Sequence, residues 1–310
     1  MQGINRTKNI KSVFLALRPN QWVKNFILFA AIIFNGKLFD WKYLSLTLIG
    51  FTIFCVISSA SYLFNDIIDL KHDKLHPEKK TRPLAAGLIN LNTAIEVAFL
   101  LGFFGLIAAL LLSTTFFFIA ATFTIIHLLY STYLKKFAIF DVMGIAFSFI
   151  LRTYAGEVLT AYHLPFWLTL TIFFGALFVA STKRHAELLT EGTTTRPTLF
   201  QYKEHLLDFY TSLFGSATIL GYALFSFLEE PPQFNAPFRT FLLNFLPQAI
   251  ALKWMIVTIP FVVFGLMRYA QLAYESKEGE RPEKIITSDI PLIVSMILWG
   301  LTIILILYIL

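Results

Sequence analysis

Residues 44–73 read LSLTLIGFTIFCVISSASYLFNDIIDLKHD, a long apolar run that passes directly into a segment of acidic side chains. As a helix, the apolar part at 44–64 is long enough to cross a hydrocarbon layer of roughly 30 Å. A segment in lipid must satisfy its own backbone polar groups, so we expect one continuous helix from the membrane to the carboxylates. This stretch predicts an all-α membrane protein.

Similar apolar runs recur along the chain, which has 310 residues, 57% of them hydrophobic and 14% charged. A soluble domain carries nearer to about a quarter charged residues. We expect one domain over 1–310, in which 1–21 is a cytoplasmic tail; its residues 9–18 form either a short interfacial helix or an ordinary basic tail. The runs predict nine transmembrane helices, at 22–39, 44–64, 93–112, 115–134, 138–159, 165–182, 209–228, 250–272 and 290–310.

Lysine and arginine are distributed unevenly between the two sides of these spans. With a cytoplasmic N-terminus, twenty of the 25 Lys and Arg residues fall on inside segments, and four fall outside, at Lys37, Lys42, Arg239 and Lys253. Basic loops stay in the cytoplasm, so this distribution predicts an N-in, C-out protein of the cell inner membrane. Topology also accounts for most of the net charge of +6, which therefore needs no nucleic-acid partner.

Four oxygen-bearing side chains at 65–73 share one face of the expected helix, because at about 100° per residue they fall within an arc of about 100°. They are Asn65, Asp66, Asp69 and Asp73. Oxygen ligands of this kind suit Mg²⁺, so we predict that Asn65, Asp69 and Asp73 bind the metal. Asp66 assists, and the three aspartates are the predicted catalytic residues. The alternative is a solvated helix end whose acids pair with Lys71 and Lys74.

The loop that follows carries basic side chains in a rigid frame. Pro77, Pro83 and Gly87 shape the segment. Its Lys80 and Arg82 would lie close to the predicted metal site, where a cation is suited to bind substrate phosphate. The positive-inside rule alone also explains how many basic residues the loop has, but not their proline-framed setting.

Polar residues at the other cytoplasmic helix ends complete the predicted substrate site. Asp141 and Arg152 share a helical face but are about 16 Å apart along the axis, so they cannot pair directly. Arg152 must meet another anion, either a ligand phosphate or a carboxylate elsewhere in the bundle. For 183–187 the alternative is a set of salt bridges within one helix. These further substrate-binding candidates are Gln21, Lys24, Tyr130, Lys135, Asp141, Arg152, Lys183, Arg184 and Glu187.

Nine spans, with N-D-x-x-D-x-x-x-D ending the second, resemble the UbiA superfamily of intramembrane prenyltransferases over nearly the whole chain. The resemblance implies a helical bundle around a central cavity and Mg²⁺ held against a diphosphate. Ordinary members carry a second D-x-x-x-D motif at the end of the sixth span. Here that position reads Lys-Arg-His-Ala-Glu, at 183–187, so one acid stands where two are expected.

This departure is typical of one branch, the decaprenyl-phosphate phosphoribosyltransferases, which the chain also resembles in four further motifs. That branch implies phosphoribosyl pyrophosphate as donor and a polyprenyl phosphate as acceptor. The acceptor is already an anion, so no general base is required, and a single displacement inverts C1. The motifs are Leu-Arg-Pro-x-Gln-Trp-x-Lys-Asn, His-Pro-x-Lys-x-x-Arg-Pro, Tyr-Ser-x-x-Leu-Lys and Leu-Arg-x-x-Ala-Gly, which begin at residues 17, 76, 130 and 151.

Two other functions are weighed against this one. An aromatic-acceptor polyprenyltransferase would use a prenyl diphosphate donor, and the missing second aspartate motif argues against it. A transporter would place charged or broken helices near the midplane, whereas here the polar residues gather at the cytoplasmic ends, with Arg152 the main exception. The polyprenyl chain length and the oligomeric state are left open by the sequence.

Overall fold

The computed structural model describes residues 10–76, 78–191, 201–202, 204–229, 236–245, 248, 252–275 and 282–309. The first nine residues of the expected tail lie outside this part of the chain, and residues 10–16 are helical. Within the described residues every regular element is a helix, so the all-α prediction is confirmed. The α-helices are α2 Ala30–Phe34, α3 Trp41–Asp73, α4 Leu91–Leu112, α5 Thr114–Thr132, α6 Phe140–Thr160, α7 Phe166–Glu191, α8 Glu204–Leu228, α9 Ala236–Phe245, α10 Ile259–Glu275, α11 Pro282–Ser288 and α12 Ile290–Ile304.

Tighter or wider helical turns connect or extend these helices. They are 3₁₀ segments at η1 Pro19–Phe29, η2 Lys79–Thr81, η3 Leu134–Lys136 and η6 Trp254–Thr258, and a π-helical end at η7 Leu305–Ile309. Among the described residues, eight helices are long and apolar enough to cross a membrane. They correspond to the second to ninth predicted spans, so the chain is a multi-pass membrane protein. The ninth crossing and the N-in, C-out topology stay predictions.

The first predicted span, 22–39, has a different helical geometry from the others. Its helical part is the 11-residue η1 followed by the five residues of α2, so the helix ends at Phe34 and residues 35–39 lie outside it, contrary to the predicted bounds. At about 2.0 Å per 3₁₀ residue and 1.5 Å per α residue, the two together cover about 30 Å. This pair is therefore as long as the hydrocarbon layer is thick, although neither part alone is.

Residues three apart in a 3₁₀ helix eclipse one another, and η1 uses this to form a straight ridge. Trp22 Nε1 donates to Ser59 Oγ at 3.0 Å, and Asn25 Nδ2 donates to Cys55 Sγ at 3.3 Å. Leu28, the next residue of the ridge, is fully buried. The ridge therefore faces the small side chains of α3, which allow a close approach.

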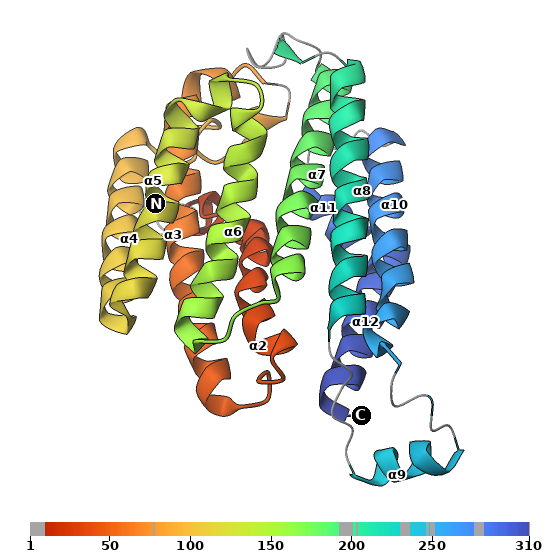
Figure 1. The fold of residues 1–310 in the computed structure, drawn as a ribbon. Coiled ribbons are helices and arrows are strands. Elements are labelled where there is room, and N and C mark those ends of the chain that lie inside the picture. Colours follow the sequence, from red (N-terminus) through yellow and green to blue (C-terminus); the bar gives the residue numbers. More distant parts are fainter. Residues whose placement is uncertain are drawn as a thin grey trace. The chain divides into compact units, whose positions relative to one another are not determined.

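The chain folds as two compact units. The first comprises 1–32, 40–162 and 191–202 and holds α3 to α6, which pack on one another and on η1 (Figure 1). Its core includes Phe54, Phe116 and Phe123. A Cβ placed on Gly156 of α6 would lie 2.1 Å from the carbonyl oxygen of Leu28, so only glycine allows this contact with η1.

The second unit comprises 33–39, 163–190 and 203–310, with α7 to α12 (Figure 1). Tyr222 of α8 accepts from Trp299 Nε1 at 2.8 Å and shares a 2.7 Å hydrogen bond with Thr258. Arg268 of α10 binds Asp289, which also caps the first turn of α12. The single domain expected from the sequence stays a prediction.

Candidate active site

The carboxylates of 65–73 are carried by the last turns of α3. This helix has 33 residues, which is about 50 Å at 1.5 Å per residue. It is longer than a bilayer crossing needs, so its last turns extend beyond the apolar stretch. The continuous helix predicted from 44 to 73 is confirmed, and it brings the four predicted side chains to one end of the first unit.

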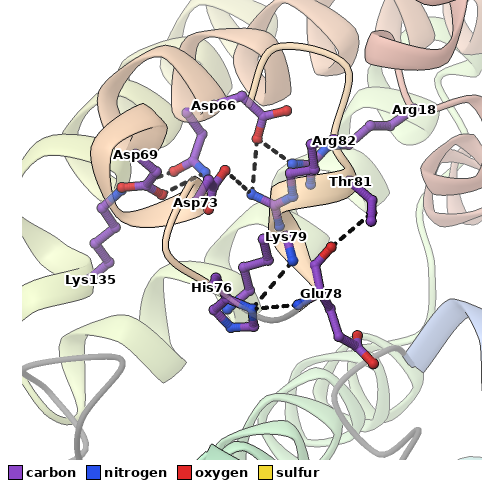
Figure 2. Close-up of polar contacts among 11 residues, drawn as sticks. Arg18, Asp66, Asp69, Asp73, His76, Glu78, Lys79, Thr81, Arg82 and Lys135 are labelled. Atoms are coloured by element: carbon purple, nitrogen blue, oxygen red, sulfur yellow. Dashed lines mark hydrogen bonds and ion pairs between the residues drawn. The ribbon is translucent and has the colours of Figure 1, made fainter. Parts of the chain in front are cut away.

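One pair of carboxylates converges on a single guanidinium nitrogen. Arg82 NH1 lies 3.1 Å from Asp66 Oδ1 and 2.6 Å from Asp73 Oδ2 (Figure 2). Both carboxylates are nearly buried, with 3% and 4% of their surface exposed. The predicted closeness of Arg82 to the acidic face is therefore confirmed, across the turn that the loop makes after α3.

A second pair of oxygen ligands faces a lysine from another helix end. Lys135 Nζ, in η3, lies 2.6 Å from Asp69 Oδ1 and 3.1 Å from Asn65 Oδ1. Asn65 Nδ2 also donates to Asp69 Oδ2 at 3.0 Å. Lys135, one of the predicted substrate-binding residues, thus reaches the acidic face from 66 residues along the chain.

Arg18, which was not among the predicted site residues, also reaches this end of α3. Its guanidinium forms an ion pair with Asp66 (Figure 2) and lies 5.7 Å from the ring centroid of Tyr62. The motif that contains Arg18 was the available signal. Its partner lies 48 residues away, which sequence spacing does not reveal.

The alternative, in which the acids at the end of α3 pair with Lys71 and Lys74 of the same segment, is wrong. Lys71 and Lys74 are exposed, and neither side chain forms an ion pair with any residue the structure describes. The three aspartates pair instead with Arg18, Arg82 and Lys135, which come from three other segments. We call these six side chains, together with Asn65, the charge cluster.

The loop after α3 is ordered by a histidine. His76 is buried, and its Nδ1 accepts from the backbone N–H groups of Glu78 at 3.2 Å and Lys79 at 3.3 Å. These bonds start η2 and so fix the turn that returns Arg82 to α3 (Figure 2). Lys80 projects from the same turn and is exposed.

The charge cluster suits Mg²⁺ in its ligand chemistry, since Asp66 and Asp73 already converge on one positive nitrogen with oxygen atoms alone. The three ligands predicted for the metal do not meet at one point. Asn65 and Asp69 face Lys135, whereas Asp73 faces Arg82. Among the described residues, no three His, Cys, Asp or Glu side chains gather as a ready metal site.

Arg152 lies deep in the first unit and bonds to neutral partners. Its Nε donates to Asn25 Oδ1 at 2.7 Å, and its NH1 donates to the Ser148 carbonyl at 2.9 Å. Its guanidinium carbon lies 4.5 Å from the ring centroid of Phe123. No carboxylate in the described part of the chain pairs with it, so the pairing considered as an alternative is not found there.

Asp141 is fully buried at the start of α6. Tyr202 donates its hydroxyl hydrogen to Asp141 Oδ1 at 2.6 Å, and that hydroxyl oxygen accepts from the Ile139 N–H at 2.6 Å. Gln201 spans the same turn between Ala138 N–H and the Lys136 carbonyl. Asp141 and Arg152 therefore do not contact each other, as their spacing required.

Three other predicted residues of the first unit lie on α5 and η1. Tyr130 of α5 packs at Gly144 of α6, where an added Cβ would lie 3.0 Å from its ring. Gln21 and Lys24 are half-buried on η1, and their side chains form no hydrogen bond or ion pair with the described residues.

The last predicted residues, Lys183, Arg184 and Glu187, belong to α7 in the second unit. Arg184 and Glu187 form an ion pair and are both buried, while Lys183 Nζ lies 3.9 Å from Glu187 Oε1. The intrahelical salt bridges considered for this segment are therefore present. Beside them His185 contacts Asp208 of α8 at 3.1 Å and stacks on Tyr274 of α10 at 4.2 Å.

The fold and the sequence both match known proteins. The family model described as the UbiA prenyltransferase family matches residues 25–290. A UbiA homolog from Archaeoglobus fulgidus, solved bound to GPP and Mg²⁺, superposes with a TM-score of 0.67 at 19% identity, over 95% of this chain and 99% of that one. The chain therefore belongs to the UbiA prenyltransferase family and is a membrane transferase of that type.

Its relatives place it more narrowly. The decaprenyl-phosphate phosphoribosyltransferase of Mycolicibacterium smegmatis is 31% identical over 94% of this chain and 91% of that protein. The protein of the same name from Mycobacterium tuberculosis is 31% identical over 95% of this chain and 93% of its own length. The resemblance to that branch, first suggested by the altered motif at 183–187, is confirmed.

Proposed function

We propose that this chain transfers the 5-phosphoribosyl group of phosphoribosyl pyrophosphate to a polyprenyl phosphate, with Mg²⁺ as cofactor and its active site on the cytoplasmic face of the inner membrane. The observation that carries the proposal is the charge cluster, in which oxygen-bearing side chains and cations suited to phosphate meet at one helix end. The names of the relatives support both substrates.

The proposed reaction is a single displacement. A phosphate oxygen of the lipid forms a bond to C1 of the ribose, the bond from C1 to the pyrophosphate oxygen breaks, and pyrophosphate leaves with the bonding electrons. No proton has to be removed, because the nucleophile is already an anion. C1 is inverted.

The residues of the charge cluster have different proposed roles, according to their chemistry. Asn65, Asp69 and Asp73 would hold Mg²⁺, with Asp66 assisting, and the metal when bound would stabilise negative charge on the leaving pyrophosphate. Arg82 and Lys135 bind donor phosphates and orient C1 toward the acceptor, and Lys80 adds a cation at the same loop. Gln21, Lys24 and Tyr130 contribute further polar contacts to substrate.

Charged residues outside the cluster also have proposed roles. Asp141 fixes the turn between η3 and α6, and with it the approach of Lys135. Arg152 fixes η1 against α6 through Asn25. On α7, Lys183, Arg184 and Glu187 stand at the position of the missing aspartate motif, where Arg184 and Glu187 pair with each other and Lys183 is part-exposed.

Donor and acceptor turnover by the purified protein tests this function. With labelled phosphoribosyl pyrophosphate, Mg²⁺ and decaprenyl phosphate, we expect label in the organic phase and an equal amount of pyrophosphate, both abolished by a chelator. Turnover of geranyl diphosphate with 4-hydroxybenzoate instead would replace this function with aromatic prenyl transfer.

The proposed topology has its own test. Single cysteines introduced at Lys80 and Lys42, in a chain with Cys55 replaced by Ser, are treated with a membrane-impermeant maleimide in intact cells. We expect labelling at position 42 only. The reverse pattern would contradict the N-in topology.

A further inference from the structure

Arg18 stands in an unfavourable backbone conformation directly before a proline. Its φ of 53° and ψ of 60° lie in the left-handed region, where a Cβ is sterically disfavoured. The residue before a proline is normally restricted to extended conformations, so Pro19 makes this position harder still to adopt. Non-glycine residues persist in such conformations only where their surroundings hold them.

The surroundings of Arg18 hold both its backbone and its side chain. Its N–H donates to the Leu15 carbonyl at 3.1 Å, and its own carbonyl accepts from Gln21 at 2.9 Å. Its guanidinium then crosses the face of Tyr62 to reach Asp66. The strained turn thus serves to aim one cation at one nearly buried carboxylate.

Asp66 is the only aspartate of the charge cluster for which the described residues provide two guanidinium partners, Arg18 and Arg82. Counted over the cluster, three carboxylates meet three cations, so the formal charge is zero. A neutral group has little attraction for a divalent cation, and the positive nitrogens repel one. Phosphate anions reverse this, because they draw the same cations away from the carboxylates.

We propose that Arg18 is a positioning residue that couples metal binding to phosphate binding. By pairing with Asp66 it keeps the charge cluster neutral, so the cluster binds a divalent cation tightly only when a pyrophosphate group arrives to pair with the released cations. Without Arg18 the cluster carries one net negative charge and attracts the metal by itself. This inference rests on the proposed function, which supplies the metal and the pyrophosphate.

The test measures Mn²⁺ binding by electron paramagnetic resonance on the purified full-length protein, with and without inorganic pyrophosphate. For the wild type we expect weak binding of Mn²⁺ alone and a large gain with pyrophosphate. Arg18→Gln should bind Mn²⁺ alone at least about tenfold more tightly, because one unit charge within a few ångströms is removed. Its gain with pyrophosphate should shrink by a similar factor.

Three further variants separate coupling from a loss of structure. Arg18→Lys keeps the charge and should retain most of the wild-type gain. Arg18→Gly relieves the left-handed strain and should behave as Arg18→Gln does, while its thermal midpoint equals or exceeds that of Arg18→Gln. Lys71→Gln removes a cation from the same helix end that does not contact the cluster, and should bind Mn²⁺ as the wild type does.

The outcomes distinguish this inference from the proposed function. If Arg18→Gln and Arg18→Gly bind Mn²⁺ like the wild type while pyrophosphate still tightens binding in all three, the role of Arg18 is refuted and the metal site stands. If Lys71→Gln tightened Mn²⁺ binding as much as Arg18→Gln, the role of Arg18 would also be refuted, because removing any nearby positive charge would then have the same effect. If the wild type binds no Mn²⁺ even with pyrophosphate, the metal-dependent function itself fails.

Discussion

The end of α3 and the end of α7 both carry charged side chains, but they neutralise them in different ways. At α3 the partners come from other segments, between 9 and 66 residues away along the chain. At α7 the ion pairs of Glu187 join residues three and four positions apart in the same helix. Charges paired between segments can change partner when a substrate arrives, whereas a pair within one buried turn mainly stabilises its own helix.

The largest effect is expected from a substitution in the charge cluster at the end of α3. Asp69→Asn removes a proposed metal ligand, and because Asp69 is part-exposed the fold should survive. We expect phosphoribosyl transfer to fall about 10³-fold, comparable with losing a key electrostatic group of a transition state. Glu96→Gln is the matched control, since it removes a carboxylate on α4 that lies outside the charge cluster. A fall of less than about tenfold for Asp69→Asn would contradict the assignment.

Breaking the ion pair at the end of α7 should instead lower the stability of the folded protein. Glu187→Gln deprives the buried Arg184 of its ion-pair partner, which we expect to destabilise the protein by about 3 kcal/mol. The measurement is the thermal midpoint of the purified protein. Arg184→Leu combined with Glu187→Leu should recover most of the loss, because neither charge is then left alone. An unchanged midpoint in Glu187→Gln would show that the pair is not structural.

A comparison of two lysines sharpens the contrast. Lys135→Met removes a cation that contacts both Asn65 and Asp69, and should raise the KM for phosphoribosyl pyrophosphate about 10- to 100-fold. Lys183→Met, which leaves the pair of Arg184 and Glu187 in place, should raise it by no more than about threefold. The KM of both variants is measured by steady-state kinetics. Equal increases in KM would remove the distinction between the two helix ends.

The smallest effect concerns a pair that lies outside the site. This pair is Asp289 and Arg268, whose hydrogen bonds lower the pKa of the Asp289 carboxyl below its ordinary value. The contribution of Asp289 to stability is therefore complete above its unfolded pKa of about 3.9. That contribution is lost as the pH falls through the lower folded pKa. The thermal midpoint of the wild type should therefore exceed that of Asp289→Asn at pH 6 and approach it toward pH 3. A constant difference would exclude this linkage.

Most of the helical framework followed from local properties of the sequence. Span length and the 100° rotation per residue predicted α3 and its acidic face, because both depend only on neighbours along the chain. The same geometry required that Asp141 and Arg152 stay apart, and they bind Tyr202 and Asn25 instead.

The partners of the charges could not be predicted in this way. Lys71 is adjacent in sequence to the acidic residues, yet Arg18 and Lys135 take the places that it was considered for. Which cation arrives depends on how η1 and η3 pack against α3, and that is set by tertiary packing. Two of the contacts that set it are the glycine approach at Gly156 and the buried hydroxyl of Tyr202.

The 3₁₀ geometry of η1 has one more consequence. Its threefold repeat that aligns Trp22, Asn25 and Leu28 also places Gln21 and Lys24 in a second row, parallel to the first and about 120° around the axis. Inserting one residue near Pro19 would turn each row about 120° around the axis, into the place of the next row. The side chains that η1 turns toward α3 are therefore fixed by the length of this segment as much as by its composition.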